Sequence, residues 1–373
     1  MEYTYRFRIY PNEAQINKIQ QTFGCCRYVY NYYLSLRNKE WEDSKRTMNY
    51  YDCSADLTKL KHTEECKWLN DVDSNALQTS IRDLDTAFKN FFRGIKKKQY
   101  VGYPIFKKKK AFPQSYRTCR TKDNIAKVGN KLKLPKVGLV KCKFSKEMKG
   151  NIVFATVIQN RVGQYYVSLY CKNVPQRTVL KTGNICGIDL GVKNLAILSD
   201  GKIINNIHSF NSSEEKLILL KRKLIGKTKG SRRYDEISNK IAKLHMHIAN
   251  KRADYIHKNT TWIMTNYDTI CIENLDVKGM LESKKYSKNI ADASFAEFHR
   301  QLEYKSKYFG KKLIVIDRYY PSSRICSVCG YKNDKLKDTK IREWDCPSCR
   351  SHHDRDLNAA INILNRGLSI INE

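Results

Sequence analysis

Four cysteines near the carboxyl end form the most specific chemical pattern in the sequence. Cys326 and Cys329 make one C-x-x-C pair, and Cys346 and Cys349 make a second pair after an interval of 16 residues. Two such pairs can place four thiolates around one ion in the tetrahedral arrangement that zinc prefers. Because protein would fill all four ligand positions, we expect a structural Zn²⁺ that holds a small ribbon together.

Three acidic residues beside apolar runs form a second candidate site. Asp189 lies in ICGIDLGVKN, Glu273 in TICIENL, and Asp356 in HHDRDLNAAINIL. A carboxylate in an apolar strand is costly to bury unless a cation compensates its charge. Carboxylates gathered at adjacent strand ends suit Mg²⁺, and two such ions can activate a water and stabilise the leaving oxygen of a phosphodiester. Each acid alone could equally be a turn or capping residue, so the prediction rests on the set.

Neighbouring residues leave alternatives open. Asp354 is a rival for the third acidic position, since it stands two residues before Asp356. His352 and His353 could coordinate a metal or shuttle protons. With four cysteines and three carboxylates available, we interpret both histidines as positional or phosphate-binding.

Hydrophobic periodicity indicates the elements of the first half. Residues 2–10 alternate as a strand, and Pro11-Asn12 is a helix-start signal. Helical spacing dominates residues 13–92, and the segment from Gly94 to Lys110 is interpreted as a basic connector that ends the helical pattern. Short β-type runs in residues 115–179 predict a small antiparallel barrel or sandwich.

In the second half, strands alternate with helices, which indicates an α/β domain. The predicted strands are ICGIDLG, NLAILSD, TICIENL and KLIVID. Helices are predicted around residues 232–252, 295–308 and 356–365. The first of these has an apolar stripe and an opposite basic face, formed by Arg232, Arg233, Lys240, Lys243, His247 and Arg252.

Composition points to a polyanionic partner. The 373 residues include 70 Lys and Arg against 37 Asp and Glu, for a net charge of +33, and such a charge favours nucleic acid. A membrane surface is disfavoured because no long apolar span, amphipathic anchor or lipidation motif is present.

The opening MEYTYRFRIYPNEAQ lacks the apolar core of a secretory signal, so we expect a reducing compartment. The 13 cysteines are odd in number, and we expect the nine outside the two pairs to be small buried hydrophobes.

The order GIDLGVKN, IENL, PSSRICSVCG with the second cysteine pair, and DRDLNAAINI resembles the split RuvC domain of the TnpB family, which includes the eukaryotic and viral Fanzor proteins. RIYPNEAQ, FGCCRYVYNYYL, GYPIFKKKKAFPQSYRT and LKLPKVG are similar to its amino-terminal half, so the resemblance covers essentially the whole chain. It implies an α+β multidomain protein: an RNase H-like (RuvC) α/β nuclease domain with an inserted zinc ribbon, a helical recognition lobe and a β-barrel wedge domain.

The resemblance also implies boundaries and roles. The expected units are the wedge in residues 1–12 and 113–180, the recognition lobe in 13–112, RuvC parts I and II in 181–320, the zinc ribbon in 321–350, and RuvC part III in 351–373. Asp189, Glu273 and Asp356 would be the catalytic acids. Asp356 is preferred over Asp354 because it precedes the Asn358-Ala359-Ala360 helix start and matches the family's Asp-x-Asn pattern.

Residues that contact DNA are predicted in the first half. Tyr50 and Gln78 match positions that read a short target-adjacent motif, whereas Ser74 stands where relatives can have a basic side chain, so the motif stays unknown. Four aromatic residues interleaved with lysines could stack on bases or simply pack in the protein: Tyr100, Tyr103, Phe106 and Tyr116. We expect the basic face of the helix around 232–252 to contact nucleic acid.

The resulting hypothesis is an RNA-guided DNA endonuclease of a mobile element, which cuts target DNA beside a short adjacent motif by two-metal hydrolysis. Its partners would be a guide RNA and double-stranded DNA, with no membrane and no required protein partner. Lysine and arginine would neutralise phosphates, and base pairing would read sequence.

Three other functions agree less well with the sequence. A guide-independent RuvC-like transposase or resolvase leaves the helical and wedge-like segments unexplained. An RNA-guided DNA-binding regulator predicts loss of an acid, yet all three are present. A zinc-ribbon transcription factor gives no reason for acids on two strands and a helix. The expected location is the cytoplasm or nucleoid of a prokaryote, or a host nucleus for a eukaryotic or viral protein.

Overall fold

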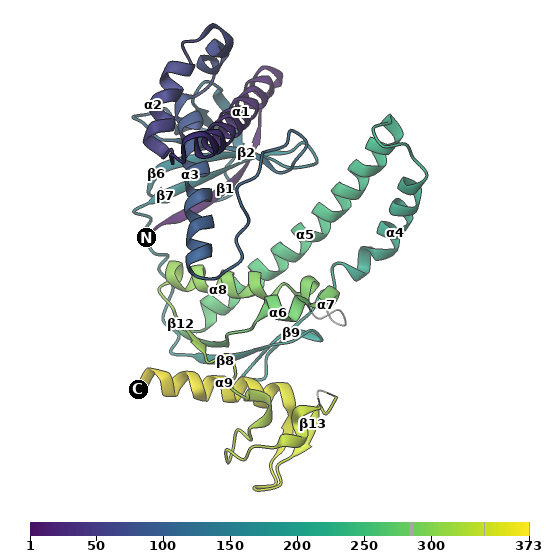
Figure 1. Cartoon of the computed structure of the whole chain (residues 1–373). Helices are drawn as coiled ribbons and strands as arrows, with labels where there is room; N and C mark the ends of the chain where they lie inside the picture. The colour runs from purple at the N-terminus through teal and green to yellow at the C-terminus, as the bar shows by residue number, and fades with distance from the viewer. Residues whose placement is uncertain (283–286, 339, 373) are drawn as a thin grey trace. The chain divides into compact units, whose positions relative to one another are not determined.

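The computed structural model describes all residues except 283–286, 339 and 373 (Figure 1). The chain divides into two compact units, Met1–Pro175 and Gln176–Glu373. Among the described residues, no helix combines the length and the apolar character needed to cross a membrane.

The first unit begins with a strand and four helical segments. Strand β1 (Tyr3–Tyr10) is followed by α1 (Glu13–Ser44), α2 (Tyr50–Leu60), the 3₁₀ helix η1 (Glu64–Asp71) and α3 (Ser74–Lys96). Helix α1 starts with a capping box. The side chain of Asn12 accepts from the Gln15 amide at 2.9 Å, and the side chain of Gln15 accepts from the Asn12 amide at 3.1 Å. The predicted helix start is confirmed.

The end of α3 differs from the prediction. The helix continues to Lys96, so Gly94 lies inside it and does not begin the connector. The connector folds back onto this glycine, since a Cβ added there would lie 2.5 Å from Cγ2 of Val101. Glycine is therefore required by the close approach of Val101 and does not break the helix.

A seven-stranded antiparallel sheet completes this unit. Its order is β2-β6-β7-β1-β5-β4-β3, and β1 lies between β7 and β5. The further strands are β2 (Gln114–Cys119), β3 (Ala126–Val128), β4 (Lys131–Leu134), β5 (Gly138–Lys143), β6 (Asn151–Gln159) and β7 (Tyr165–Lys172). The antiparallel β structure predicted for residues 115–179 is confirmed. Closure into a barrel stays a prediction, because β2 and β3 stand at opposite ends of the order.

The second unit is built on a mixed five-stranded sheet with the order β10-β9-β8-β11-β12. Its central strand β8 pairs in parallel with β11 and antiparallel with β9, and β11 pairs in parallel with β12. The strands are β8 (Ile185–Leu190), β9 (Asn194–Leu198), β10 (Ile203–Asn205), β11 (Thr269–Glu273) and β12 (Lys312–Ile316). The four strands predicted from the sequence are all present.

Helices cover both faces of this sheet (Figure 1), which explains why its strands are apolar almost throughout. The helices of this unit are α4 (Asn211–Ile225), α5 (Arg232–Asn266), α6 (Val277–Glu282), α7 (Ser287–Ala293), α8 (Phe295–Phe309) and α9 (Arg355–Asn372). Of these, α4 packs on α5 and projects away from the sheet (Figure 1). Ile263 of α5 and Phe298 of α8 pack with Ile188 and Ile272 in one core. Ile363 of α9 packs with Cys271 on the other face.

Two helices differ in detail from expectation. Helix α9 runs to Asn372, beyond the predicted end near residue 365. On α5, Arg252 is not part of a free basic face, because its Nη1 donates to the Ala291 carbonyl at 3.1 Å and lies 3.5 Å from Asp292.

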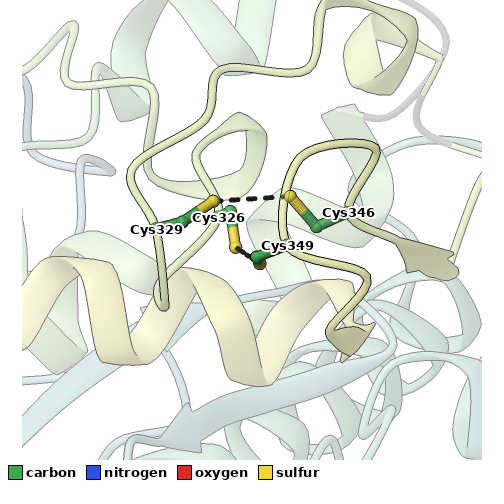
Figure 2. A group of neighbouring side chains, drawn as sticks. All are labelled: Cys326, Cys329, Cys346 and Cys349. Carbon is green, nitrogen blue, oxygen red and sulfur yellow. Dashed lines mark hydrogen bonds between the residues drawn. The ribbon is translucent and has the colours of Figure 1, made fainter.

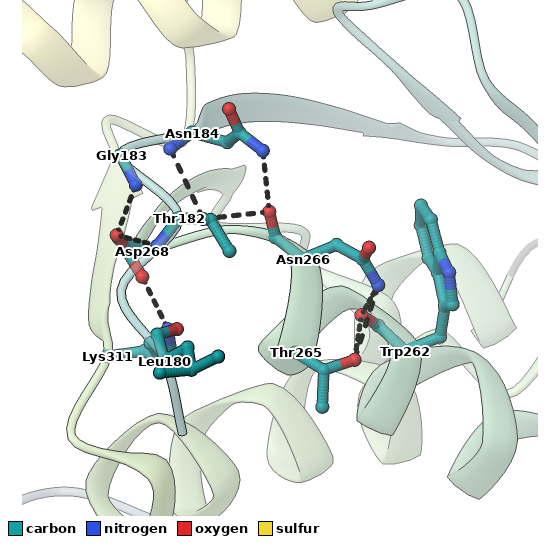
Figure 3. Close-up of polar contacts among 9 residues, drawn as sticks. All are labelled: Leu180, Thr182, Gly183, Asn184, Trp262, Thr265, Asn266, Asp268 and Lys311. Atoms are coloured by element: carbon teal, nitrogen blue, oxygen red, sulfur yellow. Dashed lines mark hydrogen bonds and ion pairs between the residues drawn. The ribbon is translucent and has the colours of Figure 1, made fainter. Parts of the chain in front are cut away.

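A polar network at the amino-terminal edge of the sheet fixes where its strands begin (Figure 3). Asp268, just before β11, accepts from the amides of Thr182 and Gly183 at 2.8 and 2.7 Å and pairs with Lys311, just before β12. The hydrogen bond from Lys311 holds the pKa of Asp268 below its ordinary value. The segments leading into β8, β11 and β12 are thereby tied together, which sets the register of the strands that carry Asp189 and Glu273.

Candidate functional site

The four cysteines meet in the ribbon between β12 and α9, where two loops face one another (Figure 2). Sγ of Cys326 lies 3.6 Å from that of Cys349, and Sγ of Cys329 lies 3.5 Å from that of Cys346. All four sulfurs lie within 4.8 Å of one another. Four converging thiols match the tetrahedral sulfur set of a structural zinc ion.

The two cysteine pairs form similar backbone turns. The Gly330 amide donates to the Cys326 carbonyl at 2.9 Å, and the Arg350 amide donates to the Cys346 carbonyl at 2.8 Å. Gly330 and Arg350 both have positive φ, 76° and 59°. Hydrogen bonds from the Ser351 hydroxyl and amide lower the pKa of Cys349 to about 6.

The two histidines have separate surroundings. His353 in β14 (His352–Asp354) is buried, its Nε2 lies 3.1 Å from Sγ of Cys326, and its ring packs against Trp344 of β13 (Glu343–Asp345). His352 is exposed and pairs with Asp345 at 2.8 Å. His353 is therefore a positional neighbour of the sulfurs.

Asp189 and Glu273 project from the same face of the second sheet. Ile188 of β8 pairs with Ile272 of β11, so the two acids that follow are neighbours at the carboxyl ends of parallel strands. Side chains alternate between faces along a strand. Cys271, two residues before Glu273, faces α9, since a Cβ on Gly367 of α9 would lie 2.3 Å from its sulfur.

Helix α9 crosses β8 at close range and brings the third acid. A Cβ added to Gly187, two residues before Asp189, would lie 2.1 Å from the Ala360 carbonyl oxygen. Asp356 stands one helical turn before Ala360, in the first turn of α9. Burial first, then the negative charges of Glu273 and Asp356, raise the pKa of Asp189 well above its ordinary value. The structure thus brings the three predicted acids to one edge.

Asp354, the rival third acid, contacts the backbone at the start of α9. Its Oδ1 accepts from the Leu357 amide at 2.8 Å, so it caps the amino terminus of α9. Asp356 instead pairs with Arg342, whose Nη1 lies 3.0 Å from Oδ1. Among the described residues, only the four cysteines place their ligand atoms within 4.8 Å of one another.

Helix α9 anchors the ribbon at two places, before the first cysteine pair and between the two pairs. Asn358 and Asn362 each donate through Nδ2 to the Ile325 carbonyl, at 2.7 and 2.6 Å. Arg355 donates from Nη1 to the Asp338 and Ile341 carbonyls at 2.6 and 3.2 Å. The ribbon is therefore fixed to the helix that carries Asp356.

Sequence reasoning missed two side chains that touch the acids. Ser322 donates its hydroxyl to Oε1 of Glu273, and burial raises the pKa of Glu273 while this hydrogen bond opposes the rise. Arg342 contacts Asp356, as described above. PSSRICSVCG contains Ser322, but only its cysteines suggested a role.

The predicted DNA-reading residues lie together in the first unit. The Tyr50 hydroxyl donates to Oε1 of Gln78 at 3.2 Å, and the Arg82 guanidinium lies 5.1 Å from the Tyr50 ring centroid. Lys61 donates to Oγ of Ser74 at 3.3 Å. Lys61, which directly follows α2, therefore places a positive charge beside Ser74, a position at which the sequence itself has no basic residue.

The four aromatic residues proposed to stack on bases divide into two groups. Tyr116 is buried at 4% exposure and packs against Phe23, so the second alternative, packing within the protein, holds for this residue and it cannot stack on a base. The Tyr103 hydroxyl donates to Asn38 at 2.7 Å and its ring contacts Phe88 and Phe91, which is ordinary packing. Two exposed rings, Tyr100 and Phe106, are still able to meet a base.

Three family descriptions match parts of the chain. Residues 1–46 match "Helix-turn-helix domain", residues 168–284 match "Probable transposase", and residues 295–363 match "Cas12f1-like, TNB domain". The first name does not describe the local structure, because residues 1–46 contain β1 and the single long helix α1.

Relatives extend over most of the sequence. A Streptomyces pristinaespiralis protein named "Putative RNA-guided DNA endonuclease" is 35% identical over 371 residues, covering 98% of this chain and 89% of that protein. The "TnpB-like protein L79" of Acanthamoeba polyphaga mimivirus is 29% identical over 219 residues, covering 54% of this chain and 41% of that protein. A solved Cas12f1-sgRNA-target DNA complex shares the fold, with a TM-score of 0.59 at 14% identity and coverage of 98% and 99%. The near-complete match to the Streptomyces protein, together with these family matches, shows that the chain belongs to the TnpB family.

Proposed function

We propose that this chain is an RNA-guided DNA endonuclease with a RuvC-type, divalent-cation-dependent centre formed by Asp189, Glu273 and Asp356. The observation that carries the proposal is the meeting of three acids from distant segments on one face of a mixed sheet. The order β10-β9-β8-β11-β12, with acids on the central strand, its parallel neighbour and a helix across the same face, supports an RNase H-like nuclease.

The acids fit magnesium by the chemistry of their donors, since Mg²⁺ prefers carboxylate oxygens. Two bound ions would supply water activation and charge stabilisation at the phosphodiester. The protein's own contribution is to hold Asp189 and Glu273 at neighbouring strand ends, where their mutual repulsion favours cation binding. In the structure described here, the Arg342 guanidinium neutralises Asp356.

The partners follow from charge and from relatives. A net charge of +33 can neutralise many phosphates of a guide RNA and its target DNA, and the named activity of the Streptomyces relative supports this assignment.

We assign residues 1–12 and 113–180 to a wedge, 13–112 to a recognition lobe, 181–320 and 351–373 to the nuclease domain, and 321–350 to the zinc ribbon. Tyr50 and Gln78, assisted by Lys61, would read the target-adjacent motif.

The test begins with the purified chain and the RNA bound to it. The RNA is sequenced, and a DNA duplex matching its guide segment is offered with Mg²⁺ or with EDTA. We expect Mg²⁺-dependent cutting that ribonuclease treatment abolishes. Cutting that survives removal of all RNA would favour the guide-independent transposase or resolvase.

The catalytic assignment is tested with a matched pair of variants. Asp189→Asn should bind RNA and target normally but fail to cut. Asp254→Asn serves as the control, because Asp254 lies on the surface of α5 in an i,i+4 pair with Lys258, and such exposed pairs contribute little. An Asp189→Asn variant that cuts at the wild-type rate would refute the assignment.

A further inference from the structure

Ser322 lies where the ribbon meets the acidic edge. It opens the short 3₁₀ helix η2 (Ser322–Arg324), between β12 and the first cysteine pair. Only 6% of its surface is exposed, and its hydroxyl donates to Oε1 of Glu273, 49 positions earlier in the chain. Burial makes this contact a fixed part of the domain.

The backbone of Ser322 is held from two sides. Its carbonyl accepts from Nδ2 of Asn362 at 2.8 Å, and its amide donates to the Tyr320 carbonyl at 2.9 Å. The same Asn362 donates to Ile325, one residue before the first cysteine. The serine hydroxyl is therefore held at Glu273 by α9 and by the entry to the ribbon.

The ribbon reinforces this placement at its first cysteine pair. The amide of Ser327, inside that pair, donates to Oδ1 of Asn358 at 2.9 Å, and Nδ2 of Asn358 binds the Ile325 carbonyl. The segment from Ser322 to Ser327 is thus clamped to α9 by two asparagines one helical turn apart. A rigid ribbon would keep the serine in place.

A glutamate has three side-chain torsions, so a single carboxylate at a strand end can point in several directions. A hydroxyl that donates to one oxygen restricts those torsions and leaves the second oxygen able to bind a cation. Groups that orient a metal ligand in this way commonly affect metal affinity or activity by about 10- to 100-fold.

We propose that Ser322 is a positioning residue for Glu273, orienting its carboxylate toward the divalent cation of the acidic edge and linking that edge to the ribbon. The inference rests on the proposed nuclease function. It assigns a role to the serine that precedes the cysteines in PSSRICSVCG.

Three variants separate this role from a general effect on folding. Ser322→Ala removes the hydroxyl, and Ser322→Thr retains it. Ser323→Ala is the matched control, because this neighbouring serine is only half buried and, among the described residues, its side chain forms no hydrogen bond with an acid. Zinc content by elemental analysis and affinity for target DNA are measured for all of them.

The first readout is Mn²⁺ binding to the nucleic-acid-free chain, followed by electron paramagnetic resonance. Ser322→Ala should bind Mn²⁺ about tenfold more weakly or worse, with zinc content unchanged. Ser323→Ala should match the wild type, and Ser322→Thr should recover most of the affinity. The second readout is single-turnover cleavage at saturating DNA, which should fall by a similar factor in Ser322→Ala while DNA affinity stays constant.

The inference is overturned if Ser322→Ala binds Mn²⁺ and cuts like the wild type, if Ser323→Ala is equally impaired, or if Ser322→Ala loses zinc along with activity. Failure of the proposed function gives a different result. In that case the wild type itself shows neither Mn²⁺ binding that depends on Asp189 nor cutting of guide-matched DNA.

Discussion

Replacing Gly187 with alanine tests whether the contact between β8 and α9 sets the acidic edge. The glycine lies in the middle of β8, two residues before Asp189, and its lack of a side chain lets α9 pass close to the strand. A Cβ at this position would lie 2.1 Å from the Ala360 carbonyl oxygen and 2.6 Å from the Leu364 amide nitrogen. Both are backbone atoms of α9, so no side-chain rotation can relieve the clash.

The size of the effect follows from these distances. Ordinary van der Waals contact of a Cβ begins near 3.4 Å, so the 2.1 Å separation requires β8 and α9 to move apart by about 1.3 Å. Overpacking of this kind costs about 1–3 kcal/mol of stability. Because α9 carries Asp356 while β8 carries Asp189, the shift separates two acids, and a displacement of about 1 Å at a reacting centre can cost about 100-fold in rate.

The assay compares thermal unfolding and single-turnover cleavage of guide-matched DNA for Gly187→Ala and a control. Gly226→Ala suits as the control, since a Cβ there meets nothing within 4 Å and the residue has a negative φ. We expect Gly187→Ala to lose stability and to cut about 100-fold more slowly, with the four-cysteine site still loaded with zinc. A variant that unfolds and cuts like the wild type would show that α9 does not depend on this glycine.

Three further predictions concern the ribbon, the cap of α9 and the sheet edge. Cys346→Ser should abolish the zinc found by elemental analysis in the wild type, because one of four thiolates is removed; an unchanged zinc content would contradict the site. Asp354→Ala should lower stability by about 0.5–2 kcal/mol through loss of the cap yet keep cutting, whereas Asp356→Ala should stop cutting, and thermal unfolding with cleavage assays distinguishes them. Asp268→Asn should lower the unfolding temperature at pH 7, because the pKa of Asp268 is depressed by Lys311. The stability that this carboxylate contributes is present above its unfolded pKa of about 3.9 and is lost as pH falls through the lower folded pKa. The unfolding temperatures of the wild type and Asp268→Asn should therefore converge in acid. A difference between them that persists in acid would contradict this account.

Local pattern predicted the elements better than the contacts between them. The apolar runs around Asp189 and Glu273 predicted the strands β8 and β11, because a strand covered on both faces must be apolar throughout. Pro11-Asn12 predicted the start of α1, and the spacing of the four cysteines predicted that their sulfurs meet at one site. These features depend on neighbours close in sequence.

The remaining features depend on partners far apart in the chain. Ser322 and Glu273 are separated by 49 positions, and periodicity carries no information about such a pair. Tyr116 was interpreted as a possible base-stacking residue from the lysines around it, but burial against Phe23 is decided by how α1 packs on β2. Asp354 and Asp356 stand two residues apart, and only the structure shows that Asp354 accepts a hydrogen bond from the Leu357 amide.

The anchoring of the ribbon on α9 has an evolutionary consequence. Asn358 and Asn362 hold the stretch before the first cysteine pair, and Arg355 holds the stretch between the two pairs, so the segment is fixed to α9 at two places outside both cysteine turns. Lineages can therefore lengthen, shorten or redecorate the tips of the two cysteine turns without disturbing the sheet. A descendant that lost its cysteines could retain the sheet and α9 only where new packing or a covalent cross-link held the chain between those two places.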